Sequence, residues 1–231
     1  MEPGTLFVVS TPIGNLGDIT LRALEVLRGV DFILAEDTRQ TRVLLDRYEV
    51  GTATVPFHEH NEARSTARVL ERLAGGESAA LVSDAGTPLV SDPGERLVAA
   101  ARERGLKVVP IPGASALLAA LAAAGVDTSR FTFYGFLPRA GRERREALDQ
   151  VSVIPHTSVL YEAPGRLAKT LRDLDTVGAG SRRVVVAREL TKKFEEFRRG
   201  TVAELASYYA DRKSTRLNSS HSRASRMPSS A

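Results

Sequence analysis

The 231-residue sequence contains no cysteine. This absence excludes disulfide bonds, thiolate zinc sites and a cysteine nucleophile. The sequence also lacks an apolar run of the roughly 18 residues that a membrane-spanning helix needs, and its start shows no basic segment followed by a long apolar one. We therefore expect a soluble, cytoplasmic protein with no membrane partner.

Several motifs of common binding sites are missing as well. No segment matches the dinucleotide pattern G-x-G-x-x-G, the phosphate loop G-x-x-x-x-G-K or the nucleophile elbow G-x-S-x-G. His58, Glu59 and His60 are of the types that bind metal, but further carboxylate ligands are missing around them, so we interpret them as a solvated helix start. Ordinary nucleotide binding and a metal centre are therefore not predicted.

The chain does have enough apolar residues for a folded core, at 42% of the sequence. Its 32 Lys and Arg residues against 28 Asp and Glu residues give a formal net charge of +4. Four charges are easily scattered over a surface, so this excess is weak evidence for a polyanionic partner.

Short apolar runs alternate with helical patterns along most of the chain. Because buried strands of parallel sheets are continuous apolar runs, we expect strands at residues 6–10, 30–36, 79–83 and 106–111, and again at 131–138, 157–162 and 182–189. Helices are expected between them, the first capped by Asp18. The alternation predicts an α/β fold with two lobes, a domain at 1–112 and a second at 113–212.

The pattern stops near Lys213. From there the sequence KSTRLNSSHSRASRMPSSA is dominated by Ser and Arg and shows neither strand nor helix periodicity. We expect residues 213–231 to be a disordered or foreign tail.

Four polar loops each follow one of the first four long apolar runs. They read STPIGN, AEDTRQTR, SDAGTP and PIPGASA. Any one of them alone is an ordinary turn, but four at the same edge of a sheet indicate a ligand site. Their hydroxyls, amides and few carboxylates favour a neutral or zwitterionic ligand with ribose hydroxyls.

These loops, with HEHNE, FYGFLP, LYEAPGRL and VVVARELTKKFEEFRRGTV, occur in the order and spacing of the tetrapyrrole methylase superfamily, which residues 5–212 resemble. The resemblance is greatest to its ribosomal RNA branch. It implies two α/β lobes with the cofactor cleft between them, a homodimer, and S-adenosyl-L-methionine as cofactor. The implied activity is 2'-O-methylation of a cytidine ribose in the decoding region of 16S rRNA, in the small ribosomal subunit. Family members continue with a further strand where this chain enters the Ser/Arg segment, so we expect a C-terminally truncated second domain.

The resemblance also implies which residues bind the methyl donor. They are Pro12, Asp84, Gly86, Thr87, Ser115, Ala116, Tyr161 and Ala187. An acidic side chain such as Asp84 is a natural partner for the ammonium or hydroxyl groups of the donor.

Candidates for catalysis lie in the same matched segments. Glu36, Asp37 and Glu189 could accept the proton of a ribose hydroxyl, and Arg39 and Lys192 could steady charge or hold a phosphate. Alternatively, Glu36 and Asp37 pair with Arg39 or Arg42 and only fix their loop.

A basic segment, PRAGRERR, follows FYGFLP. Its Arg139, Arg142, Arg144 and Arg145 are suited to RNA phosphates and exposed bases. The alternative is a solvated helix start, because Glu143 and Glu146 offset part of the charge. We expect RNA contact here.

Two other functions stay open at this point. A methylase of the same superfamily could act on a tetrapyrrole or on a modified protein residue, although such enzymes would not need the arginine cluster. The chain could also be an inactive fragment that binds S-adenosylmethionine or RNA without turnover.

Overall fold

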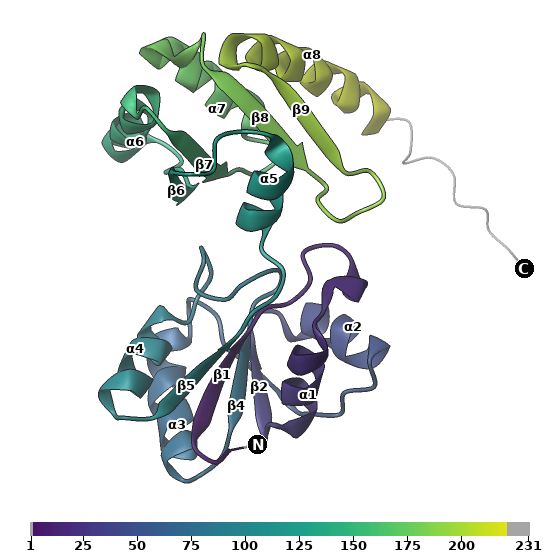
Figure 1. The fold of residues 1–231 in the computed structure, drawn as a ribbon, viewed down its shortest axis with the longest axis vertical. Coiled ribbons are helices and arrows are strands. Elements are labelled where there is room, and N and C mark those ends of the chain that lie inside the picture. The colour runs from purple at the N-terminus through teal and green to yellow at the C-terminus, as the bar shows by residue number, and fades with distance from the viewer. Residues whose placement is uncertain (1, 221–231) are drawn as a thin grey trace, which may run out of the picture. The chain divides into compact units, whose positions relative to one another are not determined.

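The computed structural model describes residues 2–220, and their side chains as far as residue 211. The chain divides into two compact units (Figure 1). The first comprises the residues up to Ala123 together with Glu189–Glu195, and the second comprises Ala124–Arg188 and the chain from Glu196 onward. The first unit extends to Ala123, beyond the boundary expected after residue 112. One contact beyond that boundary is the hydrogen bond from the Thr87 hydroxyl to the carbonyl of Ala114.

The first unit is built around a parallel sheet of five strands in the order β3-β2-β4-β1-β5. The strands are β1 (Thr5–Val9), β2 (Phe32–Ala35), β3 (Thr54–Pro56), β4 (Ala79–Val82) and β5 (Lys107–Ile111). Strands β2 and β4 are buried along their whole length, as the continuous apolar runs predict. Strand β3 was not predicted, because it is short, lies at the edge and ends in proline.

Helices cover both faces of this sheet. They are α1 (Leu21–Gly29), α2 (Thr38–Arg47), α3 (Glu62–Ala74) and α4 (Glu95–Glu103). Besides these, the 3-10 turn η1 (Leu16–Asp18) precedes α1, and α5 (Ala116–Ala124) follows β5. Apolar residues of α1 and α2 share one core with one face of the sheet, and those of α3 and α4 share another core with the opposite face (Figure 1).

Two local expectations in this unit were wrong. Helix α1 is capped by Thr20, whose hydroxyl accepts from the amide of Ala23, whereas Asp18 ends the 3-10 turn. The AEDTRQTR segment was expected to be a loop, but its residues 38–42 form the first half of α2, which starts at Thr38 with Asp37 as its N-cap. Asp and Thr are both favoured N-cap residues, so sequence alone left more than one start.

The second unit contains two sheets of two strands each. Strands β6 (Phe131–Phe136) and β7 (Thr157–Tyr161) pair in parallel, and β8 (Arg183–Arg188) and β9 (Glu196–Thr201) pair antiparallel. The helices are α6 (Gly141–Val153), α7 (Leu167–Leu174), which continues into the π turn η2 (Asp175–Ala179), and α8 (Val202–Ser220). Strand β9 was missed because its sequence, EFRRGT, has no apolar alternation.

Helix α8 passes the point where we expected regular structure to stop. It continues from Val202 through Lys213 to Ser220, in a stretch that holds no proline or glycine. Lys213, Arg216 and Leu217 favour helices. The prediction of a tail without regular structure rested on the Ser and Arg content and did not take these helix propensities into account. The rest of the expected tail, 221–231, lies outside the described residues.

No helix in the described part of the chain is long and apolar enough to cross a membrane.

Candidate functional site

The carboxyl ends of β1, β2, β4 and β5 meet at one edge of the parallel sheet. The four loops identified in the sequence all leave the strands at this edge. Strands β1 and β4 are neighbours, yet α1 after β1 and α4 after β4 pack on opposite faces. Where neighbouring strands are followed by helices on opposite faces, open α/β sheets commonly bind ligands beyond the strand ends.

The loops after β1 and β4 are joined by backbone hydrogen bonds. The amide of Thr11 donates to the carbonyl of Gly86 at 2.8 Å, and the amide of Gly86 donates back at 3.0 Å. The Thr11 hydroxyl donates to the carbonyl of Ser83 at 3.0 Å. Gly86 has φ of 90°, a left-handed conformation that favours glycine. The SDAGTP turn is therefore held in one shape.

The loop after β5 joins the same assembly. The hydroxyls of Ser10 and Thr87 lie 3.0 Å apart, and the Thr87 hydroxyl is 3.2 Å from the Ala114 carbonyl that it donates to. A side chain on Gly113 would place its Cβ 2.9 Å from that of Ser10. Glycine here lets the chain after β5 pass close to Ser10 at the end of β1.

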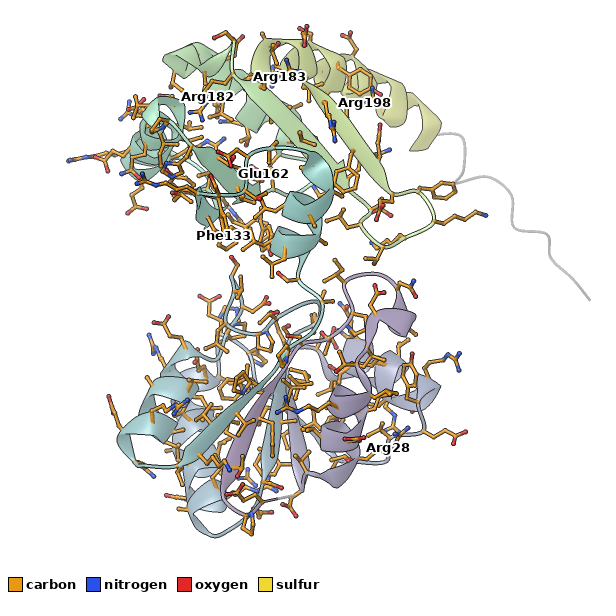
Figure 2. The ribbon with its side chains drawn as sticks, in the orientation of Figure 1. Arg28, Phe133, Glu162, Arg182, Arg183 and Arg198 are labelled. Atoms are coloured by element: carbon orange, nitrogen blue, oxygen red, sulfur yellow. The ribbon has the colours of Figure 1, made fainter. Side chains whose placement is uncertain are left out.

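Six of the expected donor residues thus lie in three linked loops of the first unit. They are Pro12, Asp84, Gly86, Thr87, Ser115 and Ala116. The other two belong to the second unit: Tyr161 ends β7, and Ala187 lies on β8 opposite Phe197. The ring of Tyr161 packs edge-on against that of Phe133, labelled in Figure 2, with 4.8 Å between centroids.

Three carboxylates gather beyond the ends of β2 and β4. Burial raises the pKa of Glu36, and the neighbouring Asp84 carboxylate raises it further. Burial also raises the pKa of Asp92 to about 6, with smaller contributions from Glu36 and Asp84. Two carboxyl groups in this cluster therefore hold protons more tightly than exposed ones do. Asp92 was missed because it follows the predicted loop, in a second turn whose sequence, SDPG, suggests only a helix start.

Asp37 and Arg39 form an ion pair at the start of α2. Asp37 Oδ1 accepts from the backbone amide of Arg39 at 2.9 Å, and the guanidinium binds both carboxylate oxygens at 3.1 and 3.0 Å. This pairing holds the pKa of Asp37 below its usual range. Of the two alternatives for Asp37, the structure thus favours pairing with Arg39, whereas Arg42 pairs with Asp46.

A pocket of about 400 Å³ opens beside Asp84 in the first unit. It is lined by Thr11, Pro12, Ile13, Gly14, Leu16, Gln40, Thr41, Val43, Leu44, Ser83, Asp84, Ala85 and Lys192. Asp84 is oriented by the amide of Asp37, which donates to its Oδ1 at 2.9 Å. A carboxylate has about four acceptor positions, so Asp84 retains capacity for a ligand.

Lys192 reaches this pocket from the segment Glu189–Glu195, which we call the strap. The Lys192 ammonium lies 3.5 Å from the carboxylate of Glu189, so two catalytic candidates come together here. Glu189 and Thr191 have φ of 52° and 64°, left-handed values that non-glycine residues rarely adopt. Such strain persists only where the surroundings fix the backbone, and the strap packs closely against Gly14.

The four arginines of the PRAGRERR segment differ in how far they are buried. Arg139, Arg142 and Arg145 are exposed. Arg144 is only 4% exposed, and its guanidinium binds Asp173 at 2.8 Å and the hydroxyl of Thr170 at 2.9 Å. The expectation that Arg144 contacts RNA is therefore wrong. Its position on the inner side of α6 directs it into the unit.

Arg144 belongs to a polar network that links α6 to α7 and β7. The Thr170 hydroxyl donates to Glu162, which is labelled in Figure 2, and Arg166 pairs with the same carboxylate at 3.2 Å. Arg182, also labelled, donates to the carbonyls of Val151 and Ser152 at the end of α6. These arginines hold the second unit together.

His58, Glu59 and His60 lie just before α3. The backbone amide of His58 donates to the side-chain oxygen of Asn61 at 2.9 Å, in a turn that leads into the helix. Among residues 2–211, no group of three His, Asp or Glu side chains is placed to hold a metal ion.

The parallel sheet and the loops at its strand ends define an open α/β protein with a candidate ligand site at the carboxyl edge of the sheet. A family model described as Tetrapyrrole (Corrin/Porphyrin) Methylases matches residues 5–206. The chain therefore belongs to the tetrapyrrole methylase family.

Curated relatives narrow the comparison further. A protein of Mesorhizobium japonicum is 50% identical over 91% of this chain and 71% of its own length, and one of Pseudomonas aeruginosa is 51% identical over 91% and 74%. One of Escherichia coli O157:H7 is 46% identical over 89% and 72%. All three are named ribosomal RNA small subunit methyltransferase I.

Solved structures share the fold at lower identity. A cobalt precorrin-4 methyltransferase matches with a TM-score of 0.66 and 18% identity, covering 91% of this chain and 90% of that one. A uroporphyrin-III C-methyl transferase from Thermus thermophilus, complexed with S-adenyl homocysteine, matches with a TM-score of 0.65 and 19% identity over 89% and 91%. At such identities these likenesses show the fold alone.

Proposed function

We propose that this chain transfers a methyl group from S-adenosyl-L-methionine to the 2'-oxygen of a cytidine ribose in the decoding region of 16S rRNA. The family membership and the names of relatives near 50% identity support methylation of ribosomal RNA. The target atom and nucleotide are the finer part of the proposal. We further propose that it acts in the cytoplasm on the small ribosomal subunit, as a homodimer.

The observation that carries the proposal is the set of three loops linked through Thr11, Gly86 and Thr87 beside the Asp84 carboxylate. These residues fit the cofactor. Asp84 offers acceptor oxygens for an ammonium group or ribose hydroxyls, and the amides at the α5 N-terminus, near Ser115 and Ala116, suit a carboxylate. Tyr161 and Ala187 stay in the proposed donor set on the strength of the family resemblance alone.

The bound cofactor supplies an electrophilic methyl group on a sulfonium. For such a transfer the protein mainly has to place the acceptor oxygen in line with the methyl carbon. The fixed SDAGTP turn and the glycine-dependent approach of β5 to β1 provide rigid positioning of this kind.

Proton removal from the acceptor is assigned to Glu36. Its pKa is raised by burial and by Asp84, so its carboxylate holds a proton better than an exposed glutamate does. Asp37 is a weaker candidate, because its pKa is lowered by Arg39. Lys192, paired with Glu189, is placed to balance the charge of a phosphate, and exposed Arg139, Arg142 and Arg145 are proposed to contact the RNA backbone.

A methylase acting on a tetrapyrrole or a protein residue is the second candidate. Its support is the fold shared with proteins such as cobalt precorrin-4 methyltransferase and diphthine synthase, at 18% and 17% identity. The relatives near 50% identity outweigh that support, because their printed name specifies ribosomal RNA. A cofactor-binding protein without turnover is the third candidate.

A methyl-transfer assay separates these candidates. Small ribosomal subunits from a strain that lacks the modification are incubated with the chain and labelled S-adenosylmethionine, and the methylated nucleotide is mapped by mass spectrometry. We expect label on one cytidine 2'-oxygen. Label on a base or on protein, or no label at all, would overturn the proposal. The proposed homodimer is tested separately, by sedimentation of the chain.

The cofactor site is tested by Asp84→Ala. We expect this change to weaken S-adenosylmethionine binding about tenfold or more, because a charge-assisted hydrogen bond is lost. Calorimetry measures the affinity, with Asp149→Ala on the exposed side of α6 as the control. An unchanged dissociation constant would remove Asp84 from the donor set.

A further inference from the structure

One side chain of the pocket beside Asp84 lacks a partner. Thr41 on α2 lines the pocket and is only 5% exposed, and its hydroxyl oxygen has no hydrogen bond in the described structure. A helical threonine commonly bonds the carbonyl one turn earlier, but the hydroxyl of Thr41 makes no such bond here. Buried hydroxyls are nearly always satisfied by protein, water or ligand, so the Thr41 hydroxyl has capacity for a group bound at the pocket.

The walls of the pocket are apolar on two sides. Pro12, Ile13 and Leu16 come from the segment after β1, and Val43 and Leu44 come from α2. Gln40 lies next to Thr41 and adds an amide that can both donate and accept. Apolar walls with a hydroxyl and an amide between them suit a flat ring with polar atoms on its edge.

The charged groups of the pocket are of opposite sign. The carboxylate of Asp84 can accept from ribose hydroxyls, and the ammonium of Lys192 can bind a phosphate. A volume of about 400 Å³ is at the lower end of ligand pockets, which is the size expected for a single nucleotide and too small for a folded RNA segment.

We propose that this pocket binds the acceptor nucleotide, with its base between the two apolar walls and its polar edge facing Thr41 and Gln40. Lys192 then holds the adjoining phosphate, and Pro12 and Asp84, both in the proposed donor set, lie at the boundary with the donor loops. A base in such a pocket has to be turned out of its stack, as enzymes that modify single nucleotides commonly require. This assignment rests on the proposed RNA methylation and adds the site of the acceptor.

The first test is Thr41→Val, which keeps the shape of the side chain and removes the hydroxyl. We expect the Michaelis constant for small ribosomal subunits to rise about threefold to tenfold, the effect of one neutral hydrogen bond. The dissociation constant of S-adenosylmethionine and the melting temperature should not change, because the hydroxyl bonds no protein group. Gln40→Leu should act in the same direction. Thr66→Val on α3, outside the pocket, is the control; it removes a hydroxyl that donates to the carbonyl of Glu62.

Outcomes against the proposal are distinct. A wild-type Michaelis constant in both variants would overturn it, and so would a weakened donor affinity in Thr41→Val, which would assign the pocket to the donor. A drop in melting temperature would show that the hydroxyl serves the fold.

A second measurement separates this inference from the proposed activity. Cytidine 5'-monophosphate is titrated into the wild-type chain and into Thr41→Val, and binding is followed by NMR. Weaker binding by the variant supports the pocket even if ribosomal subunits are not methylated. Absence of binding by the wild-type chain at millimolar nucleotide would overturn the assignment, whatever the methylation assay shows.

Discussion

Asp92 shows how a single residue can gain chemistry from its surroundings. Its carboxyl group is half-buried, and the carboxylates of Glu36 and Asp84 lie near enough to oppose its ionisation. The pKa is about 6 in the folded chain, against an ordinary value of 3.8. The unfolded chain therefore releases this proton at lower pH than the folded chain does, and the free energy of unfolding falls as pH rises from 3.8 to about 6.

Asp92→Asn removes this ionisation. We expect the variant to be more stable than the wild type by about 1 kcal/mol at pH 7.5, after allowing for the half-exposed position. At pH 3.5 both forms are uncharged, so the difference should vanish. Calorimetric melting temperatures across this pH range check the prediction, with Asp149→Asn as the control. A gain that does not depend on pH would show that burial of charge is not the cause.

Helix α6 illustrates how one element serves two purposes. Its outer side carries Arg142 and Arg145, and its inner side carries Arg144, which joins Asp173 and Thr170 on α7. Removing one partner of a buried ion pair leaves the other without compensation. Arginines that look equivalent in sequence therefore differ in their contribution to the fold.

Arg144→Ala should lower the free energy of unfolding by about 2–3 kcal/mol, less than for a fully buried pair because Asp173 also binds Lys169. Arg145→Ala should change it by less than about 0.5 kcal/mol. Urea unfolding monitored by circular dichroism measures both values. Equal effects of the two changes would contradict the burial of Arg144.

The strap is a second element whose position depends on one residue. A Cβ at Gly14 would lie 2.6 Å from Cγ of Lys192 and 2.9 Å from the carbonyl oxygen of Leu190. The lysine side chain can rotate away, but the carbonyl belongs to the backbone. A larger residue therefore has to displace the strap, and Lys192 with it.

Gly14→Ala is accordingly expected to slow methyl transfer about tenfold, because misplacement of a positioning group by a fraction of an ångström is costly. Trypsin should cleave after Lys192 or Lys193 faster than in the wild type. Gly51→Ala, where an added Cβ meets nothing within 4 Å, is the control. Unchanged cleavage and activity would show that the strap accommodates the methyl group.

At the scale of the whole molecule, charge excess and charge position have to be separated. The net charge of +4 is modest, and several arginines are used inside the units, as Arg144 and Arg182 show. An RNA surface therefore depends on arginines that remain exposed. Arg139, Arg142 and Arg145 meet this condition, although Arg142 also pairs with Glu146.

Replacing Arg139, Arg142 and Arg145 together with Ala should weaken binding to 16S rRNA. The slope of log affinity against log salt should become shallower by about 2, since each lost phosphate contact removes about 0.7–0.9. Filter binding at several salt concentrations measures the slope. The control variant replaces Arg64, Arg68 and Arg104 with Ala, which removes the same charge from the first unit. If both triple variants lose the same slope, binding follows net charge, and the segment after β6 is no specific RNA contact.

Much of the first unit could be predicted from sequence. Continuous apolar runs such as Ala79–Val82 require burial on both faces, and that requirement holds whatever the partner strands are. The polar loops after these runs had to meet at one edge once the sheet was parallel. The family motifs, being local, also identified the methylase family without any structure.

Only the tertiary structure decided which polar residues are free for chemistry. Arg144 meets Asp173 across 29 positions of sequence, and Asp84 meets the amide of Asp37 across 47. The pocket likewise joins Thr41 to Lys192, and the raised pKa of Asp92 depends on burial and, to a smaller extent, on Glu36 from another loop. Burial, pairing and charge repulsion are properties of neighbours in space. A local pattern determines which strand a residue follows, but the packing of distant segments determines what its side chain can bind.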